Sequence, residues 1–153
     1  MNLGLLSDTH GYLDPRLAKI FAGVDLILHA GDIGPDSLIA ELEVIAPVKA
    51  VLGNNDASPA FPLTQVVNLD GRKFIVHHIV APHALLPELK TRIARERPDA
   101  VIFGHSHKQF AQTIEGVWFL NPGYAGQPRF GQERSVALLH CDTQTMRVDF
   151  IRL

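Results

Sequence analysis

The chain of 153 residues is 46% hydrophobic and 20% charged, the balance of an ordinary globular protein long enough to bury one core. Its formal net charge of −2 argues against a surface dedicated to nucleic acid or to anionic membranes. No apolar run approaches the roughly 20 residues of a membrane span, and the N-terminus lacks the basic segment of a signal peptide. A single cysteine, Cys141, excludes an internal disulfide. We therefore predict one cytoplasmic domain over residues 1–153, with no membrane partner and no tight binding to nucleic acid.

Strands and helices alternate in the first third of the chain. Short apolar runs predict the strands, and apolar residues at helical spacing predict the helices. The expected strands are 3–6, 25–31 and 48–53, and the expected helices are 13–22 and 35–46. This βαβαβ order indicates a parallel sheet with right-handed crossovers.

Strands dominate the rest of the chain. Residues 64–78 contain two β-rich runs around Asp70-Gly71, a dipeptide typical of a hairpin turn. A helix is expected at 82–96, ending before Pro98. Further strands are expected at 99–104, 110–114, 117–120, 134–141 and 145–153. Together these elements predict an α/β sandwich with one continuous core.

Residue types that bind metals follow five of the expected strands. The stretches are Ser7-Asp8-Thr9-His10, Gly31-Asp32, Gly53-Asn54-Asn55-Asp56, His77-His78 and Gly104-His105-Ser106-His107. The carboxyl ends of parallel strands lie along one edge of a sheet, where ligands bind, so we expect these groups to converge. A single such motif is often only a turn or a cap, but the recurrence at five strand ends favours a metal site. Carboxylates, imidazoles and a carboxamide suit Mn, Fe, Zn, Co or Ni better than a dedicated calcium site.

In this order, the motifs resemble those of the calcineurin-like metallophosphoesterase superfamily. They are most similar to its small single-domain branch, which includes prokaryotic phosphodiesterases and a retromer scaffold subunit. The segment 119–129, FLNPGYAGQPR, also resembles the Asn-Pro-Gly segment of that branch, so the resemblance covers almost the whole chain. It implies a four-layer αββα sandwich with two central mixed β-sheets.

The resemblance also implies two divalent transition-metal ions, manganese first among them. One ion would be held by Asp8, His10, Asp32 and His107, and the second by Asp32, Asn54, His78 and His105. Asp32 would bridge the two ions. The register from Gly71 favours His78 as the ligand, because His77 falls where the branch usually has threonine, and His77 stays the alternative.

Two metal ions would neutralise charge on a phosphate and allow a bridging hydroxide to attack phosphorus in line, without a covalent enzyme intermediate. Three positions depart from the family pattern. Ile79 follows the fourth-motif histidine, where the family usually has glycine. Asn55 stands where many relatives have a histidine that protonates the leaving group, and Tyr124 stands where serine is common. His29 lies inside an apolar run, which favours packing or support of the site over ligation.

The sequence therefore predicts a dinuclear phosphodiesterase that hydrolyses small phosphate esters. One alternative is a non-catalytic metal-binding scaffold of the same fold, as the retromer relative suggests. It is disfavoured because each of the seven ligand positions holds a residue able to bind metal. A second alternative is a nuclease, which the net charge disfavours for long polymers but not for short oligonucleotides.

Overall fold

The first sheet is built around three short apolar segments that pair in parallel. The computed structural model describes residues 1–153 and forms these strands as β1 (Asn2–Leu6), β2 (Leu26–His29) and β3 (Val48–Ala50). β2 is buried along its whole length, as expected for a parallel strand covered on both faces. Two antiparallel strands, β9 (Ser135–Cys141) and β10 (Met146–Arg152), extend the sheet on the far side of β1, giving the order β10-β9-β1-β2-β3.

The second sheet has the order β4-β5-β6-β8-β7. Its strands are β4 (Thr64–Leu69), β5 (Arg72–His77), β6 (Ala100–Ile102), β7 (Gln109–Ile114) and β8 (Val117–Pro122). β5, β6 and β8 run parallel, whereas β4 and β7 are antiparallel edge strands. The predicted hairpin joins β4 to β5, with φ of 50° at Asp70 and 77° at Gly71, as a type I′ turn requires.

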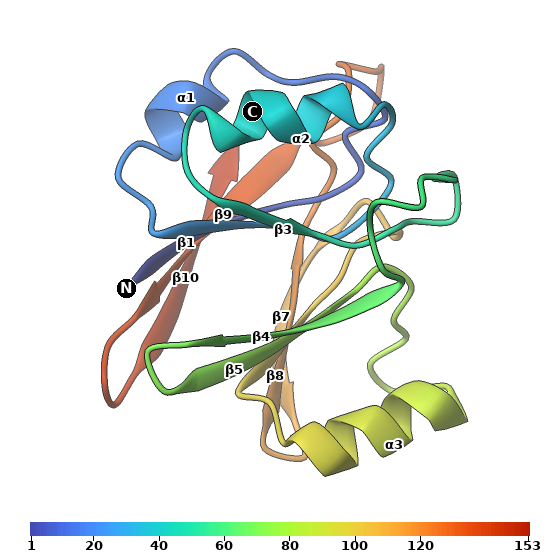
Figure 1. Cartoon of the computed structure of the whole chain (residues 1–153), viewed down its shortest axis with the longest axis vertical. Coiled ribbons are helices and arrows are strands. Elements are labelled where there is room, and N and C mark those ends of the chain that lie inside the picture. The colour runs from blue at the N-terminus through green and yellow to red at the C-terminus, as the bar shows by residue number, and fades with distance from the viewer.

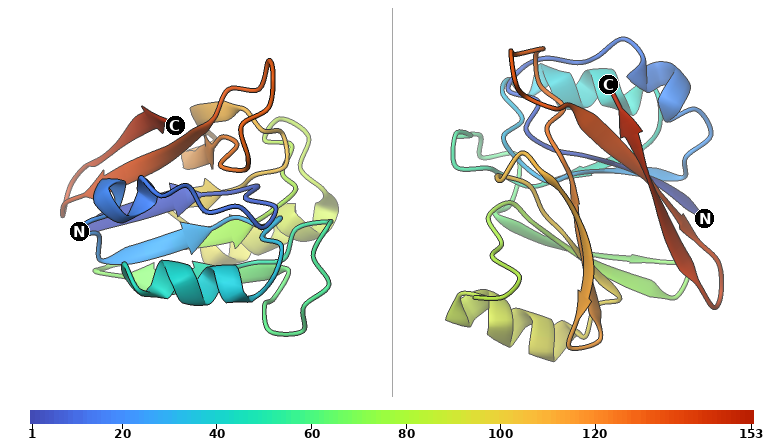
Figure 2. Two further views of the ribbon diagram at one scale, coloured as in Figure 1. Left: turned by 90° about the horizontal axis from the view of Figure 1, so that it is seen from above. Right: turned by 180° about the vertical axis from the view of Figure 1, so that it is seen from behind.

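Three helices cover the outer faces of the two sheets. Figure 1 shows α1 (Leu17–Ile20) and α2 (Ser37–Glu43) above the first sheet and α3 (Pro87–Glu96) below the second. The view from behind in Figure 2 shows the same order of layers. This arrangement confirms the four-layer αββα sandwich. None of the three helices has the length and apolar character needed to span a membrane.

Apolar side chains fill the three spaces between the four layers. The central space holds fully buried residues of both sheets, among them Leu5, Leu28, Val76, Ile102 and Leu139. Separate clusters lie under α1 and α2 and under α3. Because the two sheets share one core, the strand ends of both sheets are fixed relative to each other.

The helices are shorter than the apolar spacing predicts. The segment expected at 82–96 becomes helical only at Pro87, since Leu86 has the extended ψ of 146° that a following proline favours. Its last turn ends at Arg97, which has a left-handed φ of 49°. The expected helix at 13–22 is reduced to Leu17–Ile20, because the residues before it form a turn closed by the Asp14 carboxylate.

Candidate metal centre

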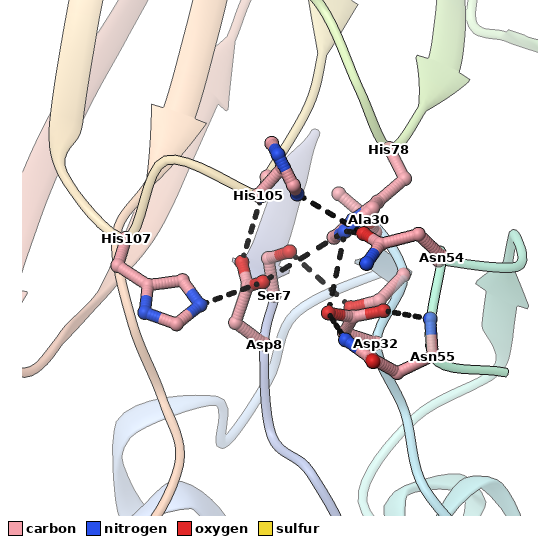
Figure 3. A network of polar contacts seen from close by, with 12 residues as sticks. Ser7, Asp8, Ala30, Asp32, Asn54, Asn55, His78, His105 and His107 are labelled. Atoms are coloured by element: carbon pink, nitrogen blue, oxygen red, sulfur yellow. Dashed lines mark hydrogen bonds and ion pairs between the residues drawn. The ribbon is translucent and has the colours of Figure 1, made fainter.

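Seven side chains singled out in the sequence converge at one end of the sandwich, and six of them are labelled in Figure 3. They are Asp8 and His10 after β1, Asp32 after β2, Asn54 after β3, His78 after β5, and His105 and His107 after β6. Within each sheet these strands are parallel, so their carboxyl ends share one edge. Packing of the sheets face to face brings the two edges together.

Asp32 lies between histidines of both sheets. Its Oδ2 atom is 3.7 Å from Nε2 of His10 and 3.5 Å from Nε2 of His78. The Oδ1 atom of Asn54 is 3.2 Å from the same Nε2 of His78 and 3.0 Å from Nδ1 of His105. Oxygen and nitrogen donors from five separate loops therefore face one small volume.

Asp8 faces the other side of this volume. Its Oδ1 atom is 3.2 Å from Nε2 of His107 and 3.9 Å from Nε2 of His78. The donor atoms form two groups that are each compact enough to hold an ion. One group comes from Asp8, His10 and His107, and the other comes from Asp8, Asp32 and His78. Asp8 belongs to both groups, whereas the sequence pattern assigned the shared position to Asp32. Asp32 nevertheless approaches His10 of the first group.

One oxygen of the buried Asp8 carboxylate accepts no hydrogen bond. The residue is 0% exposed, and although Oδ2 accepts a hydrogen bond from the backbone N–H of His105 at 3.1 Å, Oδ1 accepts none. Burial raises the pKa of Asp8 above its ordinary value, despite the hydrogen bond from Ser7 and the nearby histidines. A bound cation would supply the missing partner and favour the ionised form. The donor set therefore fits a divalent metal.

Asn55 holds Asp32 in place. Its backbone N–H donates to Oδ1 of Asp32 at 2.9 Å and its side-chain Nδ2 donates to Oδ2 at 2.7 Å. Burial works against the ionised form of Asp32, but these two donors, together with His78 and His10, leave its pKa below the ordinary value. Asp32 is thus kept as an acceptor with a fixed orientation.

Five of the candidate ligands have left-handed backbone conformations. Their φ angles are 57° at Asp8, 46° at His10, 54° at Asp32, 67° at His105 and 58° at His107. In the whole chain only three other non-glycine residues have positive φ. Aspartate and histidine tolerate this region better than most residues, but it still costs free energy. Such strain concentrated on one set of side chains is typical of a functional site rather than of a core built for stability.

The two adjacent histidines of the fourth motif point in different directions. His78 is 2% exposed, its Nδ1–H donates to the carbonyl of Ala30 at 2.7 Å, and its Nε2 faces the site. A backbone carbonyl of this kind commonly orients a metal-binding imidazole. His77 instead lies at the end of β5 opposite β4, where Nδ1 contacts the Thr64 hydroxyl at 2.8 Å. The geometry therefore favours His78 as the ligand.

Comparison with known proteins identifies the family of the chain. The model of the calcineurin-like phosphoesterase superfamily domain matches residues 1–144. The chain belongs to this superfamily. A protein of Methanothermobacter thermautotrophicus named a probable metallophosphoesterase is 32% identical over 162 residues, which cover 99% of this chain and 92% of that protein. The predicted family resemblance is confirmed.

Solved structures of calcineurin-like proteins share the fold. An archaeal phosphodiesterase is 26% identical with a TM-score of 0.81, and the match covers 100% of both chains. Vps29 of Entamoeba histolytica, solved with Zn²⁺, is 21% identical with a TM-score of 0.76 over 99% of both chains. The second likeness shows the fold alone.

Residues outside the seven ligands support the calcineurin-like site. Burial lowers the pKa of His29 to about 3, and this neutral ring accepts from the Gly31 N–H and contacts the Thr9 hydroxyl at 2.9 Å. These contacts occupy both ring nitrogens of His29 and favour support of the site over ligation. Asp56 accepts hydrogen bonds from the backbone N–H groups of Ile33, Gly34 and Gly53 and so ties two ligand loops together.

The role of Asp56 was not foreseen from the sequence, although its place in the Gly53-Asn54-Asn55-Asp56 stretch was the available signal. The Asn121 side chain was also missed. It donates to the carbonyl of Gly104 at 2.8 Å and to the hydroxyl of Ser106, fixing the loop that carries His105. Only its position in the Asn-Pro-Gly segment hinted at this.

Two glycines let the ligand loops of the calcineurin-like site approach one another. A Cβ atom at Gly53 would collide with the carboxylate of Asp32, and one at Gly104 would collide with the hydroxyl of Ser7. Both collisions involve groups with little room to move. Any larger residue at either position would therefore displace the loops that carry the donors.

Proposed function

We propose that the protein is a dinuclear metal-dependent phosphodiesterase that acts on small phosphate esters in the cytoplasm. The observation that carries this proposal is the pair of buried carboxylates, Asp8 and Asp32, which face histidine Nε2 atoms from both sheets. The unpartnered Oδ1 of Asp8 adds a direct reason for a cation at this place. The phosphodiesterase among the structural relatives supports diester chemistry.

The seven donors divide naturally between two ions. Asp8, His10, Asp32 and His107 would hold one, and Asp32, Asn54, His78 and His105 the other. When bound, the two ions supply positive charge that draws phosphate oxygens and lowers the pKa of water towards about 7, so that water can attack phosphorus in line. Manganese suits this mixture of carboxylate, imidazole and carboxamide, as do Fe, Zn, Ni and Co.

The protein's own residues prepare the site for an anion. The two carboxylates bring two negative charges, and the other five donors are neutral when they bind metal. Two divalent ions would therefore leave an excess of positive charge, which favours a phosphate ester over a neutral substrate. Asn54 and His105 are exposed, so the ester can reach the site from solvent.

Donor orientation is set before any ligand arrives. Asn55 fixes the Asp32 carboxylate, the carbonyl of Ala30 fixes the ring of His78, and the backbone N–H of His105 fixes Asp8. Groups held in this way lose little freedom on binding, which strengthens both metal affinity and charge stabilisation in the transition state.

A second candidate function is a non-catalytic scaffold of the same fold. The likeness to Vps29 is the observation that favours it. Loss of catalysis would be expected to change at least one ligand position, but all seven hold residues able to bind metal. We therefore place this function second.

Metal stoichiometry and turnover, measured on the same preparation, test the proposal. The wild type should bind two Mn²⁺ ions per chain and hydrolyse bis(p-nitrophenyl) phosphate under at least one metal of a panel. Asp32→Ala should lose both properties, whereas Glu41→Ala, an exposed change on α2, should keep them. Metal binding without turnover of any diester or monoester would instead favour the scaffold.

A further inference from the structure

A polar cavity of about 490 Å³ adjoins the candidate metal centre, and His107 lines it. It lies between the turn that follows β6 and the segment that precedes β9, and no hydrophobic residue lines it. Its polar groups come from Ser106, Lys108, Gln109, Gln132 and Glu133. The volume is within the range of roughly 300–1,000 Å³ that small-molecule sites occupy. Hydroxyl, amide and charged groups without an apolar wall suit a ligand rich in hydroxyl groups.

The far wall of this cavity belongs to the loop 127–133, which connects β8 to β9. Figure 2 shows this loop extending outward from the end of the sandwich. The loop is attached to the metal-ligand turn, since Nε2 of Gln132 donates to the backbone carbonyl of His107 at 3.2 Å. A group seated in the cavity would therefore lie beside a phosphate bound at the metals.

Two exposed cations flank the route from the metal centre to the cavity. The guanidinium carbon of Arg129 lies 5.6 Å from the centre of the Tyr124 ring, and that ring lies 4.7 Å from the ring of His107. Lys108 lines the cavity itself. The side chains of Lys108 and Arg129 are both exposed to solvent, so they can attract an incoming anion.

Phe130 stands at the tip of the loop with its side chain fully in solvent, at 108% exposure. It precedes Gly131, which lines the cavity. A phenyl ring held in water makes no contribution to the core, and it offers a flat face on which another ring can stack. Exposed aromatics of this kind commonly bind the bases of single-stranded nucleotides.

We propose that the cavity and the loop bind the nucleoside of a small nucleotide diester. The sugar hydroxyls occupy the polar cavity, the base stacks on Phe130, and Arg129 and Lys108 attract the phosphate. The assignment rests on the proposed function, because the reacting phosphate is the one held at the metal centre. In the reaction the oxygen of water forms a bond to phosphorus and loses a proton to solvent. The bond from phosphorus to the leaving oxygen breaks, and an alkoxide released in this way takes up a proton from solvent.

Two diesters with the same leaving group test the assignment. Thymidine 5′-(p-nitrophenyl phosphate) and methyl p-nitrophenyl phosphate both release nitrophenolate, so only the retained alcohol differs. We expect the wild type to show a kcat/KM about tenfold or more higher for the nucleoside ester, the size of one base-stacking contact. Phe130→Ala and Lys108→Met should each lower this ratio. The matched exposed changes Leu86→Ala and Lys90→Met should not.

A binding measurement separates this inference from the proposed function. Thymidine 5′-monophosphate and methyl phosphate would be titrated into the Mn²⁺-loaded wild type and the Phe130→Ala variant by calorimetry. Tighter binding of the nucleotide than of methyl phosphate, lost in the Phe130→Ala variant, supports the assignment even if no diester is hydrolysed. Absence of hydrolysis would contradict only the proposed function. Equal affinity for the two phosphates, or equal kcat/KM for the two esters, would overturn the assignment.

Discussion

Replacing the leaving group of the substrate by alcohols of rising pKa is expected to slow the wild-type protein steeply, because position 55 carries a carboxamide. Both N–H donors that Asn55 offers in this region, from its backbone and side chain, are used on Asp32 at 2.9 and 2.7 Å. A carboxamide has no proton to give near pH 7. His77 is turned towards Thr64, with Nδ1 at 2.8 Å from the Thr64 hydroxyl.

The magnitude follows from what a positioned general acid contributes. Proton delivery to a poor leaving group is worth about 10²–10⁴-fold in rate, or roughly 3–5 kcal/mol of barrier. Nitrophenolate leaves without that help, whereas an alkoxide needs it. For an alkyl diester, the turnover rate of the wild type should therefore be about 10²–10⁴-fold lower than that of a relative with histidine at this position.

The assay is a series of aryl and alkyl diesters of matched shape, measured under one metal and with the chemical step shown to limit the rate. Asn55→His is expected to raise turnover of the poor leaving groups more than of the nitrophenyl ester. Asn68→His, which adds the same side chain at an exposed position of β4, should leave the trend unchanged. A flat dependence in the wild type would refute the reasoning and would make His77 the first residue to test as the acid.

Three further predictions concern the ligands and the scaffold. His78→Ala should weaken metal retention by at least tenfold in a chelator competition, whereas His77→Ala should have a milder effect, since only His78 faces Asp32; the reverse ranking would contradict the geometry. Arg134→Met should lower the free energy of unfolding by about 1 kcal/mol in urea denaturation, because it removes one 2.8 Å hydrogen bond to the buried Asp14 carboxylate while Arg16 keeps its own pair with that group; no change would show that Arg16 alone suffices. Hydrogen bonds from Thr145 and Gln144 hold the pKa of Asp142 at about 2, so its stabilising contribution is present above pH ~4 and is lost as pH falls towards 2; the difference in unfolding free energy between wild type and Asp142→Asn should shrink over that range.

Residue patterns predict the parts of the molecule that depend on neighbours along the chain. The apolar runs locate the strands, the Asp70-Gly71 turn locates a hairpin, and the polar residues after each run locate the donors. Parallel pairing then brings the donors together, because the same ends of the strands must meet. These features need no knowledge of which side chains touch.

Features that depend on distant contacts could not be predicted in this way. The Ala30 carbonyl, which follows β2, favours His78 over His77 as the ligand, and this contact joins residues 48 positions apart. Asp14 and Arg134 are separated by 120 residues, and Asp14 also closes the turn that shortens the helix expected at 13–22. The bond from the Asn55 side chain to Asp32 likewise joins two loops and is invisible to any local pattern.

Crystals of the protein grown with Mn²⁺ and measured at an anomalous wavelength test the central claim most directly. The account predicts two anomalous peaks about 3.5–4 Å apart between Asp8 and Asp32, with Asn54 and the four histidines arranged around them. A site that stays empty at millimolar Mn²⁺, or a single ion bound away from these carboxylates, would contradict it.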